Sequence, residues 1–168
     1  MTQPENPPDP KRRISMERTF TASLEEVWGL WTTPEGIESW WGPEGFAVTV
    51  QALELRPGGN LRYTMTAVDP RMVAFMEQNG MPTSTVHTIT YSEVSSPRRL
   101  GYVHPVDFVP GLPVYDTSTL VELFPAERGV RMVLTFDAMH DQMWTDRQTA
   151  GWTSELGKLD ALLARRSA

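Results

Sequence analysis

Apolar and polar residues alternate along much of this chain, and the period of the alternation changes in a regular order. Residues 12–20 (RRISMERTF) alternate with the period of two that is typical of a half-buried strand. Residues 21–32 follow a helical period instead, and Ser23 with Glu26 forms the sequence pattern of a capping box. The chain therefore begins its folded part with a predicted strand and a predicted amphipathic helix.

A second short helix, a hairpin and a third helix are predicted next. Pro34, at a first helical position, indicates a helix that ends before Gly42. Residues 46–68 alternate on both sides of the turn sequence RPGGN, which is typical of a β-hairpin. The segment 69–80 starts with Asp-Pro and ends with Asn-Gly, which are the start and stop signals of a helix.

Four more strands are predicted between residues 85 and 136, each rich in aliphatic, β-branched or aromatic residues. They are residues 85–94, 99–108, 118–125 and 129–136. A proline-broken loop (DFVPGLPVYD) connects the second of these strands to the third. The order of elements predicts an α+β fold, in which one long C-terminal helix faces an antiparallel sheet of six to seven strands.

The C-terminal helix is predicted from about Asp141 to Arg166. One side of it carries Thr145, Thr149, Trp152, Leu156, Leu159, Leu162 and Leu163. The charged residues are assigned to the opposite side, and they are Asp146, Arg147, Glu155, Lys158 and Asp160. A single helix is about 10 Å wide, which is too narrow to fill the concave face of a twisted sheet of this size. The space is therefore expected to hold either large side chains or a cavity.

Composition narrows the classes of function. The length of 168 residues fits one domain, predicted at residues 12–168, after a disordered lead-in at residues 1–11. A net charge of −6 argues against nucleic acid and anionic membranes as partners. No apolar run approaches the ~20 residues of a membrane span, so no membrane insertion is expected. The absence of cysteine excludes disulfides and thiolate chemistry and fits a cytoplasmic location. A homodimer is left open.

Three separated stretches resemble the START-like helix-grip superfamily (SRPBCC). Within it, they are most similar to the branch named for homology to the activator of heat shock protein 90 ATPase (AHSA-type). The stretches are RTFTASLEEVWGLWTTPEGIESWWGP, ELRPGGNLRYTM and GWTSELGKLDALL, and the resemblance spans residues 12 to about 166. Three further segments, DPRMVAFMEQNGMP, DFVPGLPVYD and MHDQMWTD, resemble those of one bacterial subgroup. The resemblance implies a helix-grip fold, in which a curved antiparallel sheet wraps around the C-terminal helix and encloses a ligand cavity.

Members of this superfamily include binders of small hydrophobic molecules, lipid-binding-like proteins and polyketide cyclases. We therefore expect this chain to bind a small hydrophobic or aromatic ligand without a cofactor. Parity along strands and position near the expected cavity suggest the ligand-binding residues Arg18, Trp40, Trp41, Phe46, Tyr63, Met65, His87, Tyr102, His104, Phe108, Met143 and Trp144. Of Trp40 and Trp41, one is expected to pack inward and the other to line the cavity entrance.

Two His and Asp pairs leave an enzymatic alternative open. His140 with Asp141, or His104 with Asp107, could act as an acid–base pair in a cyclase or hydrolase. Asp141 also stands where a helix begins, and there the competing interpretation is an N-cap that accepts hydrogen bonds from the first turn. No metal site is expected, because the three histidines lie on three different elements.

A third function class is an interaction module of the chaperone-activator kind. It predicts a large exposed apolar patch on the surface. The co-chaperone after which the branch is named couples this domain to a separate N-terminal module that the present sequence does not show, so we expect ligand binding rather than chaperone activation.

Overall fold

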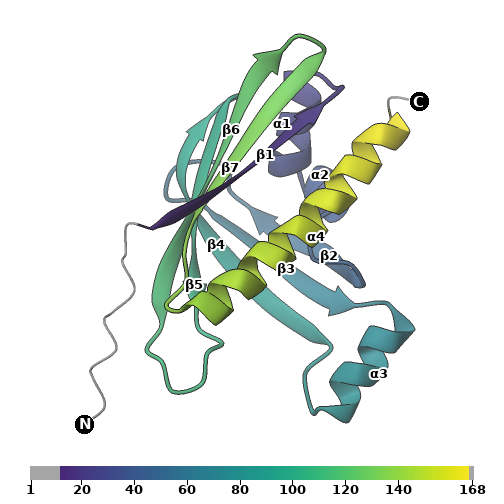
Figure 1. The fold of residues 1–168 in the computed structure, drawn as a ribbon, viewed down its shortest axis with the longest axis vertical. Coiled ribbons are helices and arrows are strands. Elements are labelled where there is room, and N and C mark those ends of the chain that lie inside the picture. The colour runs from purple at the N-terminus through teal and green to yellow at the C-terminus, as the bar shows by residue number, and fades with distance from the viewer. Residues whose placement is uncertain (1–11, 167–168) are drawn as a thin grey trace.

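A seven-stranded antiparallel sheet with the order β1-β7-β6-β5-β4-β3-β2 forms the body of the computed structural model, which describes residues 12–166. Figure 1 shows the sheet as a strongly bent layer, with the last helix lying along its open side. The strands are β1 (Arg13–Phe20), β2 (Phe46–Leu53), β3 (Asn60–Ala67), β4 (Ser84–Ser95), β5 (Arg99–Val106), β6 (Tyr115–Ala126) and β7 (Gly129–Asp137). The predicted α+β helix-grip fold is confirmed.

Four helices accompany the sheet: α1 (Leu24–Thr32), α2 (Pro34–Glu38), α3 (Pro70–Gln78) and α4 (Gln142–Arg166). The first three begin at side-chain caps that the sequence predicts. The hydroxyl of Ser23 accepts a hydrogen bond from the N–H of Glu26 at 3.1 Å, which is the first half of the expected capping box. Thr33 caps α2, and Asp69 caps α3. Each cap satisfies an N–H group that the helix itself leaves without a partner.

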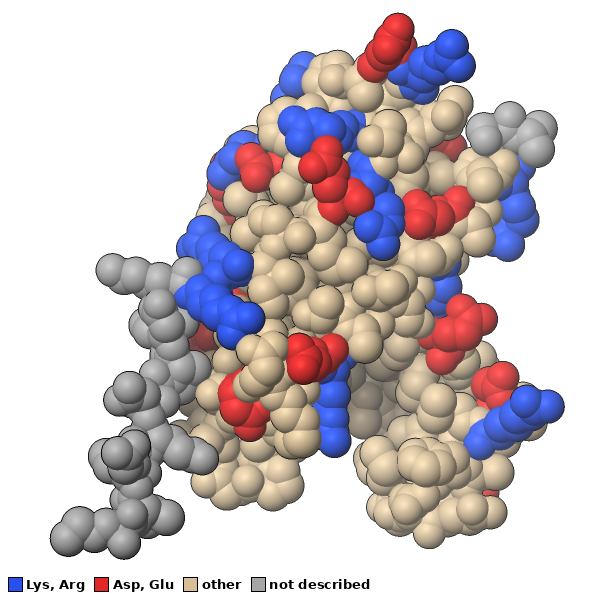
Figure 2. Space-filling model, viewed as in Figure 1, with Lys and Arg blue, Asp and Glu red and all other residues tan. Residues whose placement is uncertain are grey.

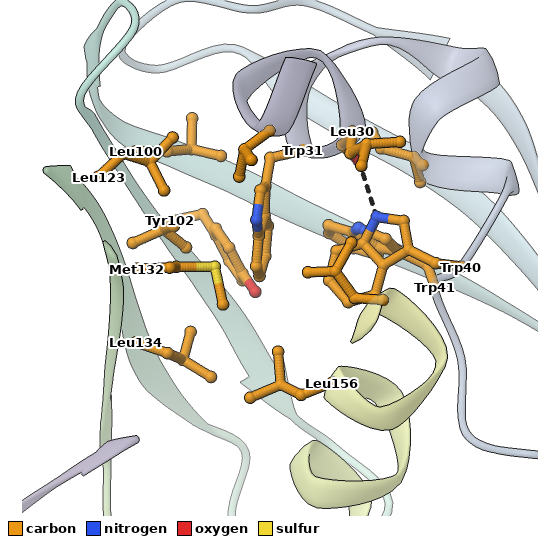
Figure 3. Packing of buried hydrophobic residues seen from close by; sticks show 14 of the residues in the cluster. Leu30, Trp31, Trp40, Trp41, Leu100, Tyr102, Leu123, Met132, Leu134 and Leu156 are labelled. Atoms are coloured by element: carbon orange, nitrogen blue, oxygen red, sulfur yellow. Dashed lines mark hydrogen bonds between the residues drawn. The ribbon is translucent and has the colours of Figure 1, made fainter. Parts of the chain in front are cut away.

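The hydrophobic core is concentrated where α1, α2 and the second half of α4 meet the sheet. Trp31 of α1 reaches into the centre of this region, with Tyr102 and Met132 on one side and Trp40 on the other (Figure 3). Trp31 and Trp40 pack edge to face with ring centroids 4.7 Å apart. The indole N–H of Trp40 donates to the carbonyl of Leu30 at 2.8 Å, so the buried ring is both packed and hydrogen-bonded.

The two halves of α4 differ in how they meet the sheet. Leu156, Leu159 and Leu163 are completely or almost completely buried. In the first half, Thr145 is the fully buried residue, and its hydroxyl accepts from the N–H of Met139 at 2.9 Å. The tryptophan-rich core therefore fills the hollow under the second half of α4, while the first half leaves space above the sheet.

The predicted domain bounds and the expected lack of a membrane span concern the whole chain. The lead-in predicted at residues 1–11 lies outside the described residues, as do the last two residues of the domain predicted at 12–168. Among residues 12–166, no helix is long and apolar enough to cross a membrane.

Candidate functional site

A pocket of about 510 Å³ lies between the first half of α4 and the concave face of β3, β4 and β5. This volume falls within the range of about 300–1,000 Å³ that is common for small-molecule sites. The sheet side is formed by Trp41, Tyr63, Val86, His87, Thr88, Ile89, Tyr102, His104 and Pro105. The helix and loop side is formed by Asp107, Phe108, Met139, Trp144, Arg147, Gln148, Gly151, Trp152 and Glu155.

The pocket opens between two protruding parts of the molecule. Figure 2 shows the surface hollowed between the part that carries α3 and the part that carries the loop after β5. Large apolar side chains are exposed on both parts. Val68, Phe75, Met81 and Val86 lie on or beside α3, and Phe108, Leu112 and Val114 lie in the loop. Val86 and Phe108 also line the pocket, so an apolar rim is formed by at least one side chain from each part.

Gly151 explains part of the free space on the helix side. It lines the pocket from α4, and a Cβ atom added at this position would meet no heavy atom within 4 Å. Trp152 packs toward Trp31 and Phe136 on one side of this space, and Leu156 is completely buried further along the helix. A narrow helix that presents a glycine to the concave face therefore leaves part of the hollow unfilled.

Aromatic rings form the inner wall of the pocket. Trp41 packs edge to face against Tyr63 with centroids 5.4 Å apart, and it lies 6.1 Å from the ring of Tyr102. Tyr63 in turn stacks on the imidazole of His87 at 5.3 Å. Such a wall offers flat apolar surfaces together with the polar atoms of tyrosine and indole, which suits an aromatic ligand that carries a few polar groups.

Glu155 places a carboxyl group against this wall. Its Oε1 accepts a hydrogen bond from the N–H of Gly42 at 3.1 Å. Burial raises its pKa to about 7, against the opposing effects of the Gly42 bond and the nearby Lys158 charge. The ammonium of Lys158 donates to the carbonyl of Gly42 at 2.9 Å, and burial lowers its pKa. Near neutral pH the carboxyl of Glu155 therefore exchanges between its charged and neutral forms.

The two pocket histidines are held in the neutral form. Burial lowers the pKa of His87 and of His104, although the charge of Asp107 opposes this effect at both. The Nε2 atom of His87 lies 2.8 Å from the hydroxyl of Thr85, and that of His104 lies 3.0 Å from the hydroxyl of Thr117. At pH 7 both rings are thus uncharged hydrogen-bonding groups.

Seven of the twelve suggested ligand-binding residues line the pocket. They are Trp41, Tyr63, His87, Tyr102, His104, Phe108 and Trp144. Trp40 packs into the core, and Trp41 lies in the inner wall of the pocket rather than at its entrance. Whether any of these residues binds a ligand stays a prediction.

Besides Trp40, four of the suggested residues lie outside the pocket lining. Arg18 is on the inward side of β1, but its guanidinium lies 3.4 Å from the carboxylate of Asp160 on α4. Phe46 and Met65 lie beside Gly42 and do not line the pocket. Met143 is 54% exposed, because it points away from the sheet in the first turn of α4.

The pair His140 and Asp141 lies at the start of α4 and does not line the pocket. The Oδ1 atom of Asp141 accepts from the N–H of Trp144 at 2.8 Å, which confirms that this aspartate caps the helix. The Nδ1 atom of His140 lies 2.6 Å from the hydroxyl of Tyr115. His104 and Asp107, by contrast, both reach the pocket.

Sequence patterns missed most of the helix side of the pocket. Glu155 was assigned to the solvent side of α4, and this assignment is wrong because Glu155 is half-buried and lines the pocket. Arg147 was also assigned there; it is exposed and also lines the pocket. Lys158 was assigned there too, yet its ammonium contacts backbone carbonyls next to Glu155. The spacing could have revealed Glu155, since it follows Gly151 by four residues and Trp152 by three and so shares their face.

A metal site is not formed by the residues that the structure describes. No group of three or more histidine, aspartate or glutamate side chains is gathered there in a way that could hold a metal ion. The polar groups of the pocket are instead carboxyl, imidazole, phenol and indole groups, which come from β3, β4, β5, α4 and the loops.

Comparison with known proteins places the fold in a defined group. The family model described as "Activator of Hsp90 ATPase homolog 1-like protein" matches residues 21–164. A protein from Chromobacterium violaceum has a similar structure, with a TM-score of 0.73 and 24% identity over 90% of this chain and 96% of that one. The AHSA1-like protein from Aeromonas hydrophila is similar with a TM-score of 0.71 and 23% identity over 93% and 94% of the two chains.

A further bacterial structure, the AHSA1 protein from Silicibacter pomeroyi, has a TM-score of 0.71 and 21% identity over 92% of this chain and 99% of that one. At these identities the likeness establishes the fold alone. The comparison with curated proteins gave no match.

Proposed function

We propose that this chain, which belongs to the family of activator of Hsp90 ATPase homolog 1-like proteins, binds a small hydrophobic or aromatic molecule between its sheet and α4. Family membership confirms the resemblance seen in the sequence and agrees with the observed fold, but it does not determine the activity. The observation that carries the proposal is the 510 Å³ pocket with its aromatic wall and apolar rim. A cytoplasmic location without a cofactor remains part of the proposal.

The test is to fill the pocket without disturbing the fold. Gly151→Phe places a benzyl group in the pocket, where a new Cβ atom meets no neighbour within 4 Å. Gly157→Phe is the matched control, because Gly157 lies on the same helix with the same free space but outside the pocket lining. We expect the wild type and Gly157→Phe to take up one apolar fluorescent probe per chain, and Gly151→Phe to take up none.

Two results would contradict the proposal. One is equal uptake by the two glycine variants, which would place the probe elsewhere on the surface. The other is no stoichiometric uptake by the wild type. Circular dichroism of each variant shows whether the helix is retained, so that loss of uptake is not mistaken for loss of folding.

An acid–base enzyme is a second candidate, and one observation favours it. His104 and Asp107 line the same pocket as Glu155, whose pKa of about 7 suits proton transfer at neutral pH. This alternative predicts turnover of a ring-forming or hydrolysable substrate that collapses in His104→Gln. A carrier shows binding without turnover, so the two functions are separated by product analysis.

A further inference from the structure

We infer that the inner end of the pocket recognises a hydroxyl group on a mostly apolar, ring-shaped ligand, such as a phenol. This inference rests on the proposed function and names the ligand class for it. The groups that carry it are the carboxyl of Glu155 on α4, the hydroxyl of Tyr63 on β3 and the hydroxyl of Tyr102 on β5.

These three polar groups face one space. All three residues line the pocket, and the charge of Glu155 is close enough to raise the pKa of both tyrosines, second in effect to their burial. Figure 3 shows the hydroxyl of Tyr102 directed away from its strand and toward α4. The tyrosines therefore stay protonated and keep an O–H that can donate.

Part of this hydrogen-bonding capacity is unused among the described residues. Glu155 uses Oε1 for the N–H of Gly42, while its Oε2 accepts no hydrogen bond, and the hydroxyl of Tyr63 makes none. Trp41, which contacts both tyrosine rings, has an indole N–H that is buried without a partner. Buried polar groups normally find partners, so this set points to an oxygen atom that a bound molecule would supply.

A hydroxyl fits this set better than other groups. It donates to the carboxylate of Glu155 and accepts from a tyrosine at the same time, whereas a carbonyl or an ether can only accept. It also pairs with Glu155 in either protonation state, because a neutral carboxyl donates to the hydroxyl oxygen. The aromatic edges of Trp41 and Tyr63 then hold the ring that carries it.

Charged ligand groups fit less well. The ammonium of Lys158 already lies beside Glu155, bound to the carbonyls of Gly42 and its neighbours, so a second cation would be repelled. A ligand carboxylate at the inner end would meet the carboxyl of Glu155, while the lining cation Arg147 lies over the ring of Trp144 at 5.0 Å. An uncharged hydroxyl avoids both conflicts.

Three ligands of nearly equal size separate the contribution of the hydroxyl from that of the ring. Naphthalene has no polar group, 1-methoxynaphthalene can only accept, and 1-naphthol can donate and accept. We expect the wild type to bind 1-naphthol about tenfold more tightly than either of the others, since a hydrogen bond to a charged group is worth about one order of magnitude or more. Competition against the fluorescent probe measures all three.

Two variants assign the preference to the site. Glu155→Gln keeps an oxygen for the N–H of Gly42 but loses the carboxylate, and Tyr63→Phe loses only a hydroxyl. Each should reduce the preference for 1-naphthol to about threefold or less while naphthalene binds as before. Asp160→Asn is the control, because it changes a carboxylate of the same helix that lies outside the pocket. It should keep the full preference.

The outcomes separate the two proposals. Equal affinity of the wild type for the three compounds overturns the hydroxyl site and leaves the apolar pocket standing. Failure of all three to displace a bound probe also overturns the hydroxyl site, whereas failure of the probe itself to bind overturns the proposed function. An unchanged preference in Glu155→Gln and in Tyr63→Phe also overturns the hydroxyl site, and either variant suffices if the other does not fold.

Discussion

Glu155 holds its carboxyl group in surroundings that make the charged form costly. Its pKa is about 7 in the folded protein, whereas the ordinary value that applies to the unfolded chain is 4.5. The folded state therefore binds this proton more tightly, and stability falls as the pH rises from about 4.5 to about 7. The difference corresponds to about 3 kcal/mol at most, an order-of-magnitude figure for a half-buried group.

Replacing Glu155 by Gln removes this loss of stability at high pH. Relative to the wild type, the variant should gain up to about 3 kcal/mol between pH 5 and pH 8. Other titratable groups near the carboxyl are present in both proteins, so their contributions to the pH dependence of stability largely cancel in the difference. These groups are His87, His104, Tyr63, Tyr102 and Lys158. Urea denaturation of both proteins at the two pH values measures the change. A difference that does not depend on pH would show that Glu155 is not buried as described.

The pocket residues that lie on strands were easier to predict than those that lie on α4. Tyr63, His87 and Tyr102 follow from the alternation of their strands, because successive side chains of a strand point to opposite faces. Glu155 does not follow from polarity alone, since a charged residue on an amphipathic helix is normally solvated. Its place depends on the free space beside Gly151, which is a property of the tertiary structure.

At the scale of elements, the contact between α1 and α2 determines where Trp41 lies. Gly36 of α2 packs so closely that an added Cβ atom would be 2.1 Å from the carbonyl oxygen of Gly29. Gly36→Ala should therefore cost about 1–3 kcal/mol of stability, as overpacking does. Because Trp41 follows α2 directly, the same change should weaken probe uptake.

Gly29→Ala is the matched control on the other helix. A Cβ atom at Gly29 meets nothing within 4 Å, so alanine should stabilise α1 by about 0.5–1 kcal/mol through its better helix propensity and leave probe uptake unchanged. Thermal unfolding and probe titration of both variants provide the comparison. A neutral effect of Gly36→Ala on both measurements would mean that α2 does not fix the pocket wall.

Most elements could be predicted because their signals are local. The caps at Ser23, Thr33 and Asp69 and the glycine turns lie within a few residues of the helices and strands that they delimit. The register of the sheet could not be predicted, and neither could the irregularity between Val50 and Ala52 in β2, because both depend on pairing between distant strands.

At the scale of the whole molecule, the mismatch between one helix and a bent sheet is resolved in two ways. The tryptophans of α1 and of the segment after α2 fill the hollow under the second half of α4, and the first half leaves it open. The sequence predicted that the space between helix and sheet would hold either large side chains or a cavity. It could not show that side chains fill the space under one half of the helix and a cavity lies under the other. That division depends on which tertiary contacts α1 makes.

An open pocket in an otherwise packed domain makes global stability depend on the ligand. A molecule that binds only the folded state at 100 times its Kd adds about 2.7 kcal/mol. For a chain of this size we expect the Tm of the wild type to rise by roughly 5–10 °C with 1-naphthol. Gly151→Phe should unfold at a temperature that the ligand does not change, because the benzyl group occupies the site. Differential scanning calorimetry measures both shifts, and an unshifted wild type at saturating ligand would exclude binding to the folded state.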